Sequence, residues 1–361
     1  MLLLISLLSF FLPTQLALHA NGLQTTVYGF RIDYLTPTLY LTDIIAVLII
    51  ILGVRKFKLT KKYIVYSVLY ISFAAINILH SIYYLPALYK WIRLTEMALL
   101  AVTILKNKKF NLYKNFVVPL SYSMIVVNFL GIFQFLNKGS IGGIFYWLGE
   151  RAFRFSDPNI SPFPYSTFSH PNSYAGFLLV FFIFLLQYKS KFKPFYFWMS
   201  AILIGINLVM TNSQNVYLTI VLLLIIKLKP NFSHSFLSFD FLSRSFTHRI
   251  ELIKTSLQLI KENFWIGVGL NNFIPNLPLV TNKFLNSWEL QPVHNIFLLI
   301  FSEVGIFGLV AFLFLFLFAL SPATYSLYAI AITGLSDHYW LTLQQNILLL
   351  TYTLAIGYAK K

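Results

Sequence analysis

Long apolar runs, separated by short basic clusters, dominate the hydrophobic pattern of the chain. A membrane-spanning helix needs about 20 largely apolar residues, with a lower limit near 17. The candidate spans lie near residues 1–18, 37–54, 63–82, 91–105, 116–136, 173–187, 195–210, 213–227, 296–319, 322–336 and 340–358. Several of them are short. The pattern predicts an all-α, polytopic transmembrane helix bundle of about 11 or 12 spans.

Clusters of Lys and Arg follow alternate spans and predict the orientation of the chain. They lie at residues 55–62, 106–114, 189–193, 227–229 and 360–361. Because such residues concentrate in cytoplasmic loops, both termini are expected inside. Eight spans then end inside at Lys229, whereas His294 has to be outside if the last three spans are to end inside. An extra crossing is needed, and only the short, polar segment 231–247 is available. This segment is a degenerate helix, a re-entrant segment, or evidence against the eighth span.

The segment 248–264 has the periodicity of an amphipathic helix. The apolar side chains that recur every three or four positions are Ile250, Ile253, Leu257, Ile260 and Phe264. Such a helix either lies on the membrane or caps the bundle. It belongs to an external region, 231–295, between the middle and the C-terminal spans.

The composition agrees with a membrane protein, since 58% of the residues are hydrophobic and 11% are charged. The net charge of +16 comes from loops beside apolar runs rather than from one basic face, so nucleic acid is not an expected partner. The chain has no cysteine, which excludes disulfides and thiolate chemistry. The first apolar residues lack a preceding Lys or Arg and a good cleavage site, so we expect an uncleaved first helix.

Ionisable residues beside membrane spans are costly and are therefore candidates for function. His294 stands at the external start of a long apolar helix, and Glu303 follows about 13 Å deeper at helical rise. Gly305 and Gly308 allow a neighbouring helix to approach closely. An interfacial His, with a Glu satisfied by another helix, is an equally good interpretation of these residues alone.

A second cluster lies in the predicted external loop 149–176. Its polar members are Arg151, Arg154, His170 and Asn172. Together with Arg249, its two arginines would be able to hold a pyrophosphate through charge-assisted hydrogen bonds. The alternative is contact with lipid headgroups. TNSQN at 211–215 and Asp337-His338 are either further polar candidates or ordinary external turns.

Several motifs that would indicate other activities are missing from the sequence. It has no Walker A motif, so ATP-driven transport is not expected. It has no HExxH motif and no external pair of adjacent carboxylates, so no metal site is predicted. Gly267-Val268-Gly269 follows a helix instead of a strand, which indicates a tight turn rather than a dinucleotide site.

Three motifs resemble the O-antigen ligase and O-antigen polymerase superfamily of bacterial membrane glycosyltransferases. They are SHPNSYAG at 169–176, THRIELIKTSLQLIKENFWIGVGLNNF at 247–273 and VHNIFLLIFSEVGIFG at 293–308. The residues that match the family pattern are Arg154 before Pro171-Asn172, Arg249 opening the amphipathic helix, and His294, Asn295 and Glu303 on the following helix. The resemblance covers roughly 150–340.

The chain departs from the family pattern in two places. The family often has Thr-x-Ser-Arg after its mid-chain span, and Gln214 stands at that Arg position here. One phosphate contact is therefore either lost or supplied by Arg151. The helix expected before the amphipathic segment is nearly absent, in agreement with the missing crossing.

The resemblance implies transfer of a glycan from a polyprenyl-pyrophosphate carrier to an acceptor hydroxyl, without a metal or cofactor. The reaction would take place on the external face of the bacterial cytoplasmic membrane, with His294 as general base. The residues expected to contact substrate are Arg154, Arg249, Arg151, Asn172, Asn295, Glu303, His170 and His338. The implied partners are membrane lipid, the lipid-linked glycan donor, and a glycan, lipid or protein acceptor.

The expected organisation has three parts. They are N-terminal transmembrane helices at 1–148, a catalytic region at 149–340 including 231–295, and a last helix with a cytoplasmic tail at 341–361. A lipid-linked sugar flippase or exporter is the main alternative function, but charges at mid-depth are few apart from Glu303 and Glu96, which argues against a polar path. A glycosyltransferase with Asp33 as base and a non-catalytic membrane protein of the same fold stay open.

Overall fold

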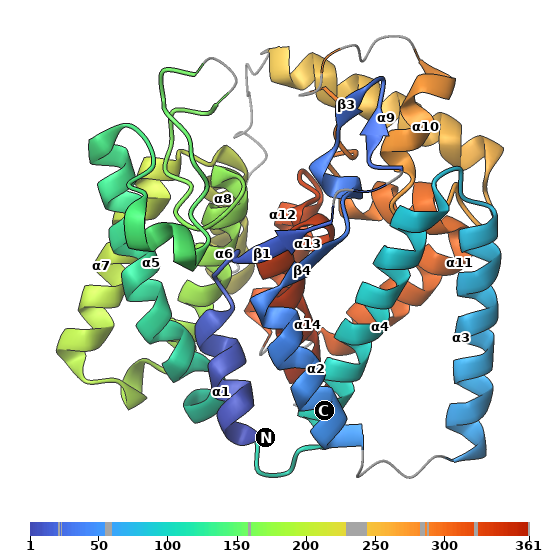
Figure 1. Cartoon of the computed structure of the whole chain (residues 1–361). Helices are drawn as coiled ribbons and strands as arrows, with labels where there is room; N and C mark the ends of the chain where they lie inside the picture. Colours follow the sequence, from blue (N-terminus) through green and yellow to red (C-terminus); the bar gives the residue numbers. More distant parts are fainter. Residues whose placement is uncertain are drawn as a thin grey trace.

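The computed structural model is the predicted all-α helix bundle (Figure 1). Its described part also contains two small β-sheets, which were not predicted. The structure describes residues 1–20, 22, 24–54, 60–157, 160–228, 244–281, 286, 289–320 and 324–359. The crossing predicted at 231–247 lies mostly outside these residues, and its last four positions already belong to a later helix. The division into three parts stays a prediction.

Helices coincide with all of the predicted spans. They are α1 (Leu2–Phe11), α2 (Leu41–Val54), α3 (Lys61–Leu79), α4 (Tyr84–Lys106), α5 (Val118–Asn137), α6 (Pro171–Gln187), α7 (Pro194–Thr211), α8 (Gln214–Leu228), α11 (Ile296–Ala319), α12 (Tyr325–Gly334) and α14 (Gln344–Ala359). By length and composition, three helices in the described ranges are able to cross a membrane: Tyr113–Asn137, α7 and α11. Shorter apolar helices, including α1, α2 and α6, accompany them. The chain is therefore an integral membrane protein.

The first predicted span, 1–18, is wrong in its second half. α1 ends at Phe11 because Pro13 lacks the N–H that would continue the helix. The chain then forms strand β1, which pairs antiparallel with β4, and a second antiparallel pair joins β2 to β3. The strands are β1 (Ala17–His19), β2 (Thr26–Val27), β3 (Phe30–Arg31) and β4 (Thr38–Tyr40).

The remaining helical elements of the described chain are mostly short. They are the 3₁₀ turns Asp33–Leu35, Gly143–Leu148 and Lys189–Lys191, the π-helical turn Tyr113–Val117, and the helices α9 (Arg244–Glu262), α10 (Phe273–Val280) and α13 (Tyr339–Thr342). Among the longer helices, α6 has most of its side chains buried. It packs against α7, α8, α12 and α14, so its N-terminus is held from several sides.

A buried ion cluster joins α2, α4 and α14. Arg93 Nη1 lies 2.6 Å from Asp43 Oδ1 and also pairs with Glu96, while Arg93 Nη2 donates to Gln344 Oε1. Gln344 in turn donates to Asp43 Oδ1 at 2.7 Å. Charged side chains within a helix bundle are tolerated when they are paired in this way. Glu96 therefore has a structural partner.

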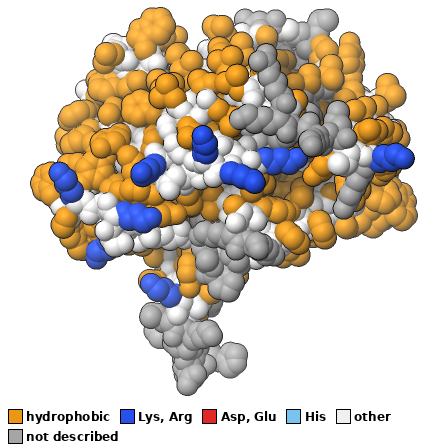
Figure 2. Space-filling view, turned by 90° about the horizontal axis from the view of Figure 1, so that it is seen from below, with side chains coloured by type: hydrophobic (Ala, Val, Ile, Leu, Met, Phe, Trp, Pro, Cys, Tyr) orange, Lys and Arg blue, Asp and Glu red, His pale blue; other side chains and the backbone are white. Residues whose placement is uncertain are grey.

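The two ends of the bundle differ in charge. Both termini and the loops that join α4 to α5 and α6 to α7 lie at one end, and α9 and α10 lie at the other (Figure 1). Figure 2 views the end with the termini, where Lys and Arg are scattered and no acidic side chain is visible among the coloured atoms. The exposed lysines of these loops are Lys106, Lys108, Lys109, Lys114, Lys189, Lys191 and Lys193. This is the distribution that the positive-inside rule expects of a cytoplasmic face.

α9 is the predicted amphipathic helix, but its buried face agrees only in part with the predicted apolar face, sharing Ile260 with it. The buried side chains are Leu252, Thr255, Ser256, Leu259 and Ile260. Ile253 and Leu257 are instead 39% and 53% exposed. The buried face includes Thr255 and Ser256, which an analysis of hydrophobic periodicity counts as polar. Ser256 Oγ lies 2.7 Å from Ser302 Oγ of α11. α9 packs against α10 and α11 and thus caps the bundle.

Gly305 interrupts α11 and lets the loop after α9 approach the helix backbone. Its φ of 69° and ψ of −169° belong to a region that essentially only glycine adopts. Backbone N–H groups of the loop bond to the interrupted helix, from Val268 to the Ser302 carbonyl at 2.9 Å and from Gly269 to the Glu303 carbonyl at 3.0 Å. Gly269 itself has a φ of 103°. The predicted tight turn is confirmed. The close approach occurs at Gly305, but the approaching segment is the loop after α9 rather than a helix, and at Gly308 the nearest atoms belong to Val304 of α11 itself.

A Gly305→Ala substitution is expected to destabilise the folded protein by about 3 kcal/mol or more. The added Cβ would lie 2.3 Å from the Trp265 carbonyl oxygen, in addition to the backbone strain. Gly205→Ala is the matched control, because its Cβ would meet no atom within 4 Å. Thermal unfolding in detergent measures both variants, and equal melting temperatures would contradict the proposed role of Gly305.

Candidate functional site

The start of α6 is built by the sequence His-Pro-Asn. His170 is the N-cap, and its Nδ1 accepts a hydrogen bond from the Asn172 N–H at 3.1 Å. Pro171 suits the first helical position because its missing N–H would have no partner there. The Asn172 side chain reaches across to donate to Asp337 Oδ2 at 3.4 Å. This hydrogen bond ties α6 to the turn between α12 and α13.

The start of α11 is tied to the same turn. Asn295 is its N-cap, with Oδ1 accepting from the N–H groups of Phe297 at 2.9 Å and Leu298 at 3.0 Å. Asn295 Nδ2 donates to the Leu335 carbonyl at 3.0 Å. These bonds serve the fold, and the predicted role of Asn295 with the acceptor stays a prediction. Their effect is to place His294 beside the turn.

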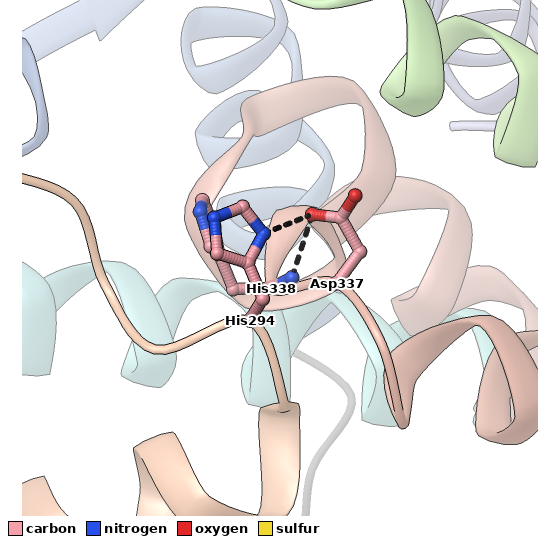
Figure 3. Close-up of side chains that lie close together, drawn as sticks. All are labelled: His294, Asp337 and His338. Carbon is pink, nitrogen blue, oxygen red and sulfur yellow. Dashed lines mark hydrogen bonds and ion pairs between the residues drawn. The ribbon is translucent and has the colours of Figure 1, made fainter. Parts of the chain in front are cut away.

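His294 lies against Asp337 and His338 (Figure 3). His294 Nδ1 is 3.7 Å from Asp337 Oδ1, and the two imidazole rings are 4.9 Å apart between centroids. The backbone N–H of His338 donates to the same carboxylate oxygen, Asp337 Oδ1, at 2.8 Å. On its other side, His294 Nε2 lies 3.2 Å from Gln291 Oε1. The His294 side chain is 16% exposed and that of Asp337 is 7% exposed, so His294 is the more accessible of the pair.

Burial and neighbouring charges set the protonation of the turn. Burial alone would raise the pKa of Asp337, but His294, followed by His338 and His170, lowers this pKa well below its ordinary value. Burial, and next the charge of His294, lowers the pKa of His338 to about 3. At neutral pH Asp337 is therefore an anion and His338 is neutral. A buried anionic carboxylate beside an imidazole is able to fix the ring orientation.

The folded protein is expected to lose about 2 kcal/mol of stability between pH 6.5 and pH 5 through His338. The folded pKa is lowered to about 3, so in this range the unfolded chain binds a proton that the folded chain does not. Stability falls as the pH falls from the unfolded pKa toward the folded one. Melting temperatures in detergent at the two pH values measure the loss, which should shrink in His338→Asn and persist in His80→Ala, at an exposed histidine. An unchanged loss in His338→Asn would contradict this assignment.

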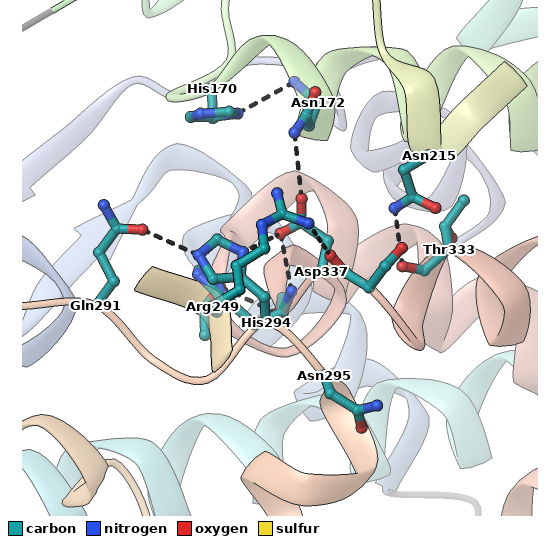
Figure 4. A network of polar contacts seen from close by, with 12 residues as sticks. His170, Asn172, Asn215, Arg249, Gln291, His294, Asn295, Thr333 and Asp337 are labelled. Carbon is teal, nitrogen blue, oxygen red and sulfur yellow. Dashed lines mark hydrogen bonds and ion pairs between the residues drawn. The ribbon is translucent and has the colours of Figure 1, made fainter. Parts of the chain in front are cut away.

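Of the predicted arginines, Arg249 contacts this turn and Arg151 contacts the segment before α6. Arg249, on α9, donates from Nη1 to the Ser336 carbonyl at 3.1 Å (Figure 4). Arg151 donates to the Ser169 carbonyl at 3.2 Å. His170 experiences the charges of both arginines together with those of His294 and Asp337. These groups therefore share one region.

Arg154 is placed differently. Its backbone pairs with that of Gly139, and it lines a cavity of about 630 Å³ formed by residues 137–140 and 153–156. Arg249 and Arg151 are among the charges that shift the pKa of His170, whereas none of the charges that shift the pKa of His170, Asp337 or His338 comes from Arg154. The structure thus brings Arg249 to the turn that carries Asp337 and Arg151 beside His170, and it leaves Arg154 apart from this group.

Glu303 is buried deeper on α11 and serves another contact. Its Oε1 accepts from the Phe273 N–H, the first of α10, at 3.2 Å. Glu303 therefore fastens α10 to α11, and a contact with substrate stays a prediction. The turn at 211–215 lies against α12, where Asn215 Nδ2 donates to the Thr333 carbonyl at 3.0 Å (Figure 4).

Sequence reasoning missed the roles of Asp337 and Gln291. Asp337 was visible as part of a polar turn, but its position opposite His294 depends on how α12 returns to the start of α11, which no local pattern reveals. Gln291 is a single neutral residue with no motif around it. His294, Asp337 and His338 also each offer a ligand atom within 4.8 Å of one another. This grouping differs from the metal motifs that a sequence displays.

Residues 167–313 match the family model described as O-antigen ligase. We call this stretch, which is similar to the O-antigen ligase family, the O-antigen ligase region. The predicted family resemblance is confirmed, and the O-antigen ligase region contains the start of α6, α9 and α11, with Arg249 and His294. Arg151 and the Asp337 turn lie outside the matched range. A comparison with curated proteins finds no match.

The family match supports a membrane glycosyltransferase of the O-antigen ligase or polymerase type. Members of this type act on lipid-linked glycans in a membrane. The apolar helices agree with that setting. The match identifies neither the carrier lipid nor the reacting residues.

Proposed function

We propose that this protein transfers a glycan from a polyprenyl-pyrophosphate carrier to an acceptor hydroxyl on the external face of the bacterial cytoplasmic membrane. The observation that carries the proposal is the convergence of His294, Asp337 and Arg249 at the O-antigen ligase region. A base, an orienting carboxylate and a cation are the groups that such a transfer needs.

In the proposed reaction, His294 removes the proton of the acceptor hydroxyl. The acceptor oxygen forms a bond with the anomeric carbon of the glycan as the bond from that carbon to the pyrophosphate oxygen breaks. The lipid pyrophosphate leaves with its electron pair and an added negative charge. Arg249, and Arg151 from the loop before α6, would stabilise that charge through charge-assisted hydrogen bonds.

Asp337 would act as a positioning residue. With the Nδ1 proton of His294 directed at the Asp337 carboxylate, the lone pair on Nε2 is available for the acceptor proton. In the structure, His294 Nε2 lies 3.2 Å from Oε1 of the Gln291 side-chain amide. Rotation of that amide by half a turn would present an N–H to the same lone pair, so an incoming hydroxyl has to displace Gln291.

The external orientation of this site is supported by charge. α9 and α10 lie at the end opposite the lysine-bearing loops and both termini (Figures 1 and 2). If that basic end faces the cytoplasm, the capped end faces outward. A lipid-linked glycan would then meet the site after its passage across the membrane.

Reconstituted vesicles test the proposed function. The purified full-length protein would be given a polyprenyl-pyrophosphate glycan and a lipid or saccharide acceptor. We expect a covalent glycan-acceptor product. Movement of the donor between leaflets without any product would contradict the proposal and favour an exporter.

A further inference from the structure

The ring nitrogens of His294 are unequally partnered. Nε2 lies 3.2 Å from the Gln291 carbonyl-type oxygen, which is only an acceptor, so this contact is a hydrogen bond when the proton resides on Nε2. Nδ1 is then unprotonated. It is buried without a hydrogen-bond partner and lies 3.7 Å from Asp337 Oδ1. A lone pair and a carboxylate that face each other in a buried site attract a cation.

The contacts of Thr342 favour one tautomer of His338. The Thr342 hydroxyl donates to the His338 carbonyl at 3.2 Å, so its oxygen is free to accept from His338 Nδ1–H at 2.8 Å. The unprotonated nitrogen is then Nε2. Both histidines thus have one nitrogen held by a neighbour and the other available. Histidines that bind metals are oriented in this way by the partners of their second nitrogen.

We propose that His294, Asp337 and His338 bind a divalent transition-metal ion of the Zn²⁺ class, and that this ion inhibits the site. The ligands would be His294 Nδ1, His338 Nε2 and an Asp337 carboxylate oxygen. Two imidazoles and one carboxylate are a ligand set of Zn²⁺, whereas Mg²⁺ and Ca²⁺ prefer oxygen ligands throughout.

The distances between these three side chains suit a bound Zn²⁺ ion if the ligand atoms move slightly closer together. Zn²⁺ bonds of about 2.0–2.2 Å in tetrahedral geometry place neighbouring ligand atoms about 3.4 Å apart. His294, Asp337 and His338 each offer one ligand atom within 4.8 Å of the others, and His294 Nδ1 is 3.7 Å from Asp337 Oδ1. The fourth position would be left for water or for an oxygen of a substrate.

The expected inhibition depends on which nitrogen of His294 binds the ion, and it rests on the proposed function. Bound Zn²⁺ would occupy His294 Nδ1 and the carboxylate that is proposed to orient the ring. It would thereby hold the proton on Nε2, the nitrogen that the proposed reaction needs in its unprotonated form. The metal-bound and the active forms of the site exclude each other.

Calorimetric titration of the tag-free, full-length protein in detergent with ZnCl₂ tests the site. We expect one ion per chain, with affinity lowered about 10-fold or more in His294→Ala and His338→Ala. Thr342→Val, which keeps all three ligands, should weaken binding about 10-fold through the loss of its hydrogen bond. His80→Ala is the control and should bind as the wild type does. No stoichiometric binding, or binding that none of the site variants weakens, would overturn the proposal.

A second arm separates the metal site from the proposed function. Zn²⁺ at saturating concentration should abolish glycan transfer by the wild type, and a chelator should restore it. Binding with undiminished transfer would overturn the inhibitory part of the inference and contradict His294 as the base. If no transfer is found under any condition, the calorimetric arm still decides whether the site binds metal.

Discussion

Replacing His294 with alanine is expected to lower the rate of glycan transfer about 10³-fold, because the acceptor hydroxyl would lose its base. The side chain stands before the N-cap of α11 and forms no capping bond itself, so the fold should persist. The loss of rate is expected in kcat, which is measured in vesicles with saturating donor and acceptor.

His80→Ala is the matched control for this prediction. His80 is an exposed histidine at the end of α3, and its ring lies 3.2 Å from Asn263 Oδ1, outside the candidate site. Its removal should change the rate by less than about threefold, within the range of surface substitutions. Wild-type transfer in His294→Ala would show that another group serves as the base.

Replacing Arg249 with alanine is expected to lower transfer about 100-fold, through loss of a donor to the departing pyrophosphate. Arg249→Lys should recover part of this loss, because lysine keeps the charge but not the planar pair of N–H donors. Arg249 also bonds to the Ser336 carbonyl, so melting temperatures are needed to separate catalysis from stability.

Arg31→Ala controls for a general effect of positive charge. Arg31 lies on β3 in an exposed pair with Asp33, and its loss should change transfer little. If attraction of the anionic donor to a basic surface were the main role of Arg249, both arginine variants would lose activity at low salt and differ little at high salt. That pattern would contradict a local pyrophosphate contact.

The helical fold was predictable because apolar runs of sufficient length have few structures open to them in a membrane. The sequence also indicated where α6 and α11 begin, through His-Pro-Asn and His-Asn, whose polar side chains cap the two helices. The local sequence was sufficient to predict these helix starts. It did not predict the end of α1, because the apolar run continues through residues 12–18 into β1.

Contacts between residues far apart in the chain could not be predicted from the sequence. The buried face of α9 includes Thr255 and Ser256, which a hydrophobic periodicity counts as polar. Asp337 lies beside His294 on a turn that Asn295 and Asn172 bind from two other helices. Arg154 and Arg151 are three positions apart, yet one lines a surface cavity and the other lies beside His170.

The central claim is that His294 and Asp337 act as one catalytic unit in glycan transfer. Transfer rates of His294→Ala, Asp337→Asn and the double variant, measured in the same vesicles, test it most directly. We predict that Asp337→Asn alone is slower than wild type and that the double variant is no slower than His294→Ala, because Asp337 acts only through the imidazole. Rate losses that multiply in the double variant, or wild-type transfer in Asp337→Asn, would contradict the claim.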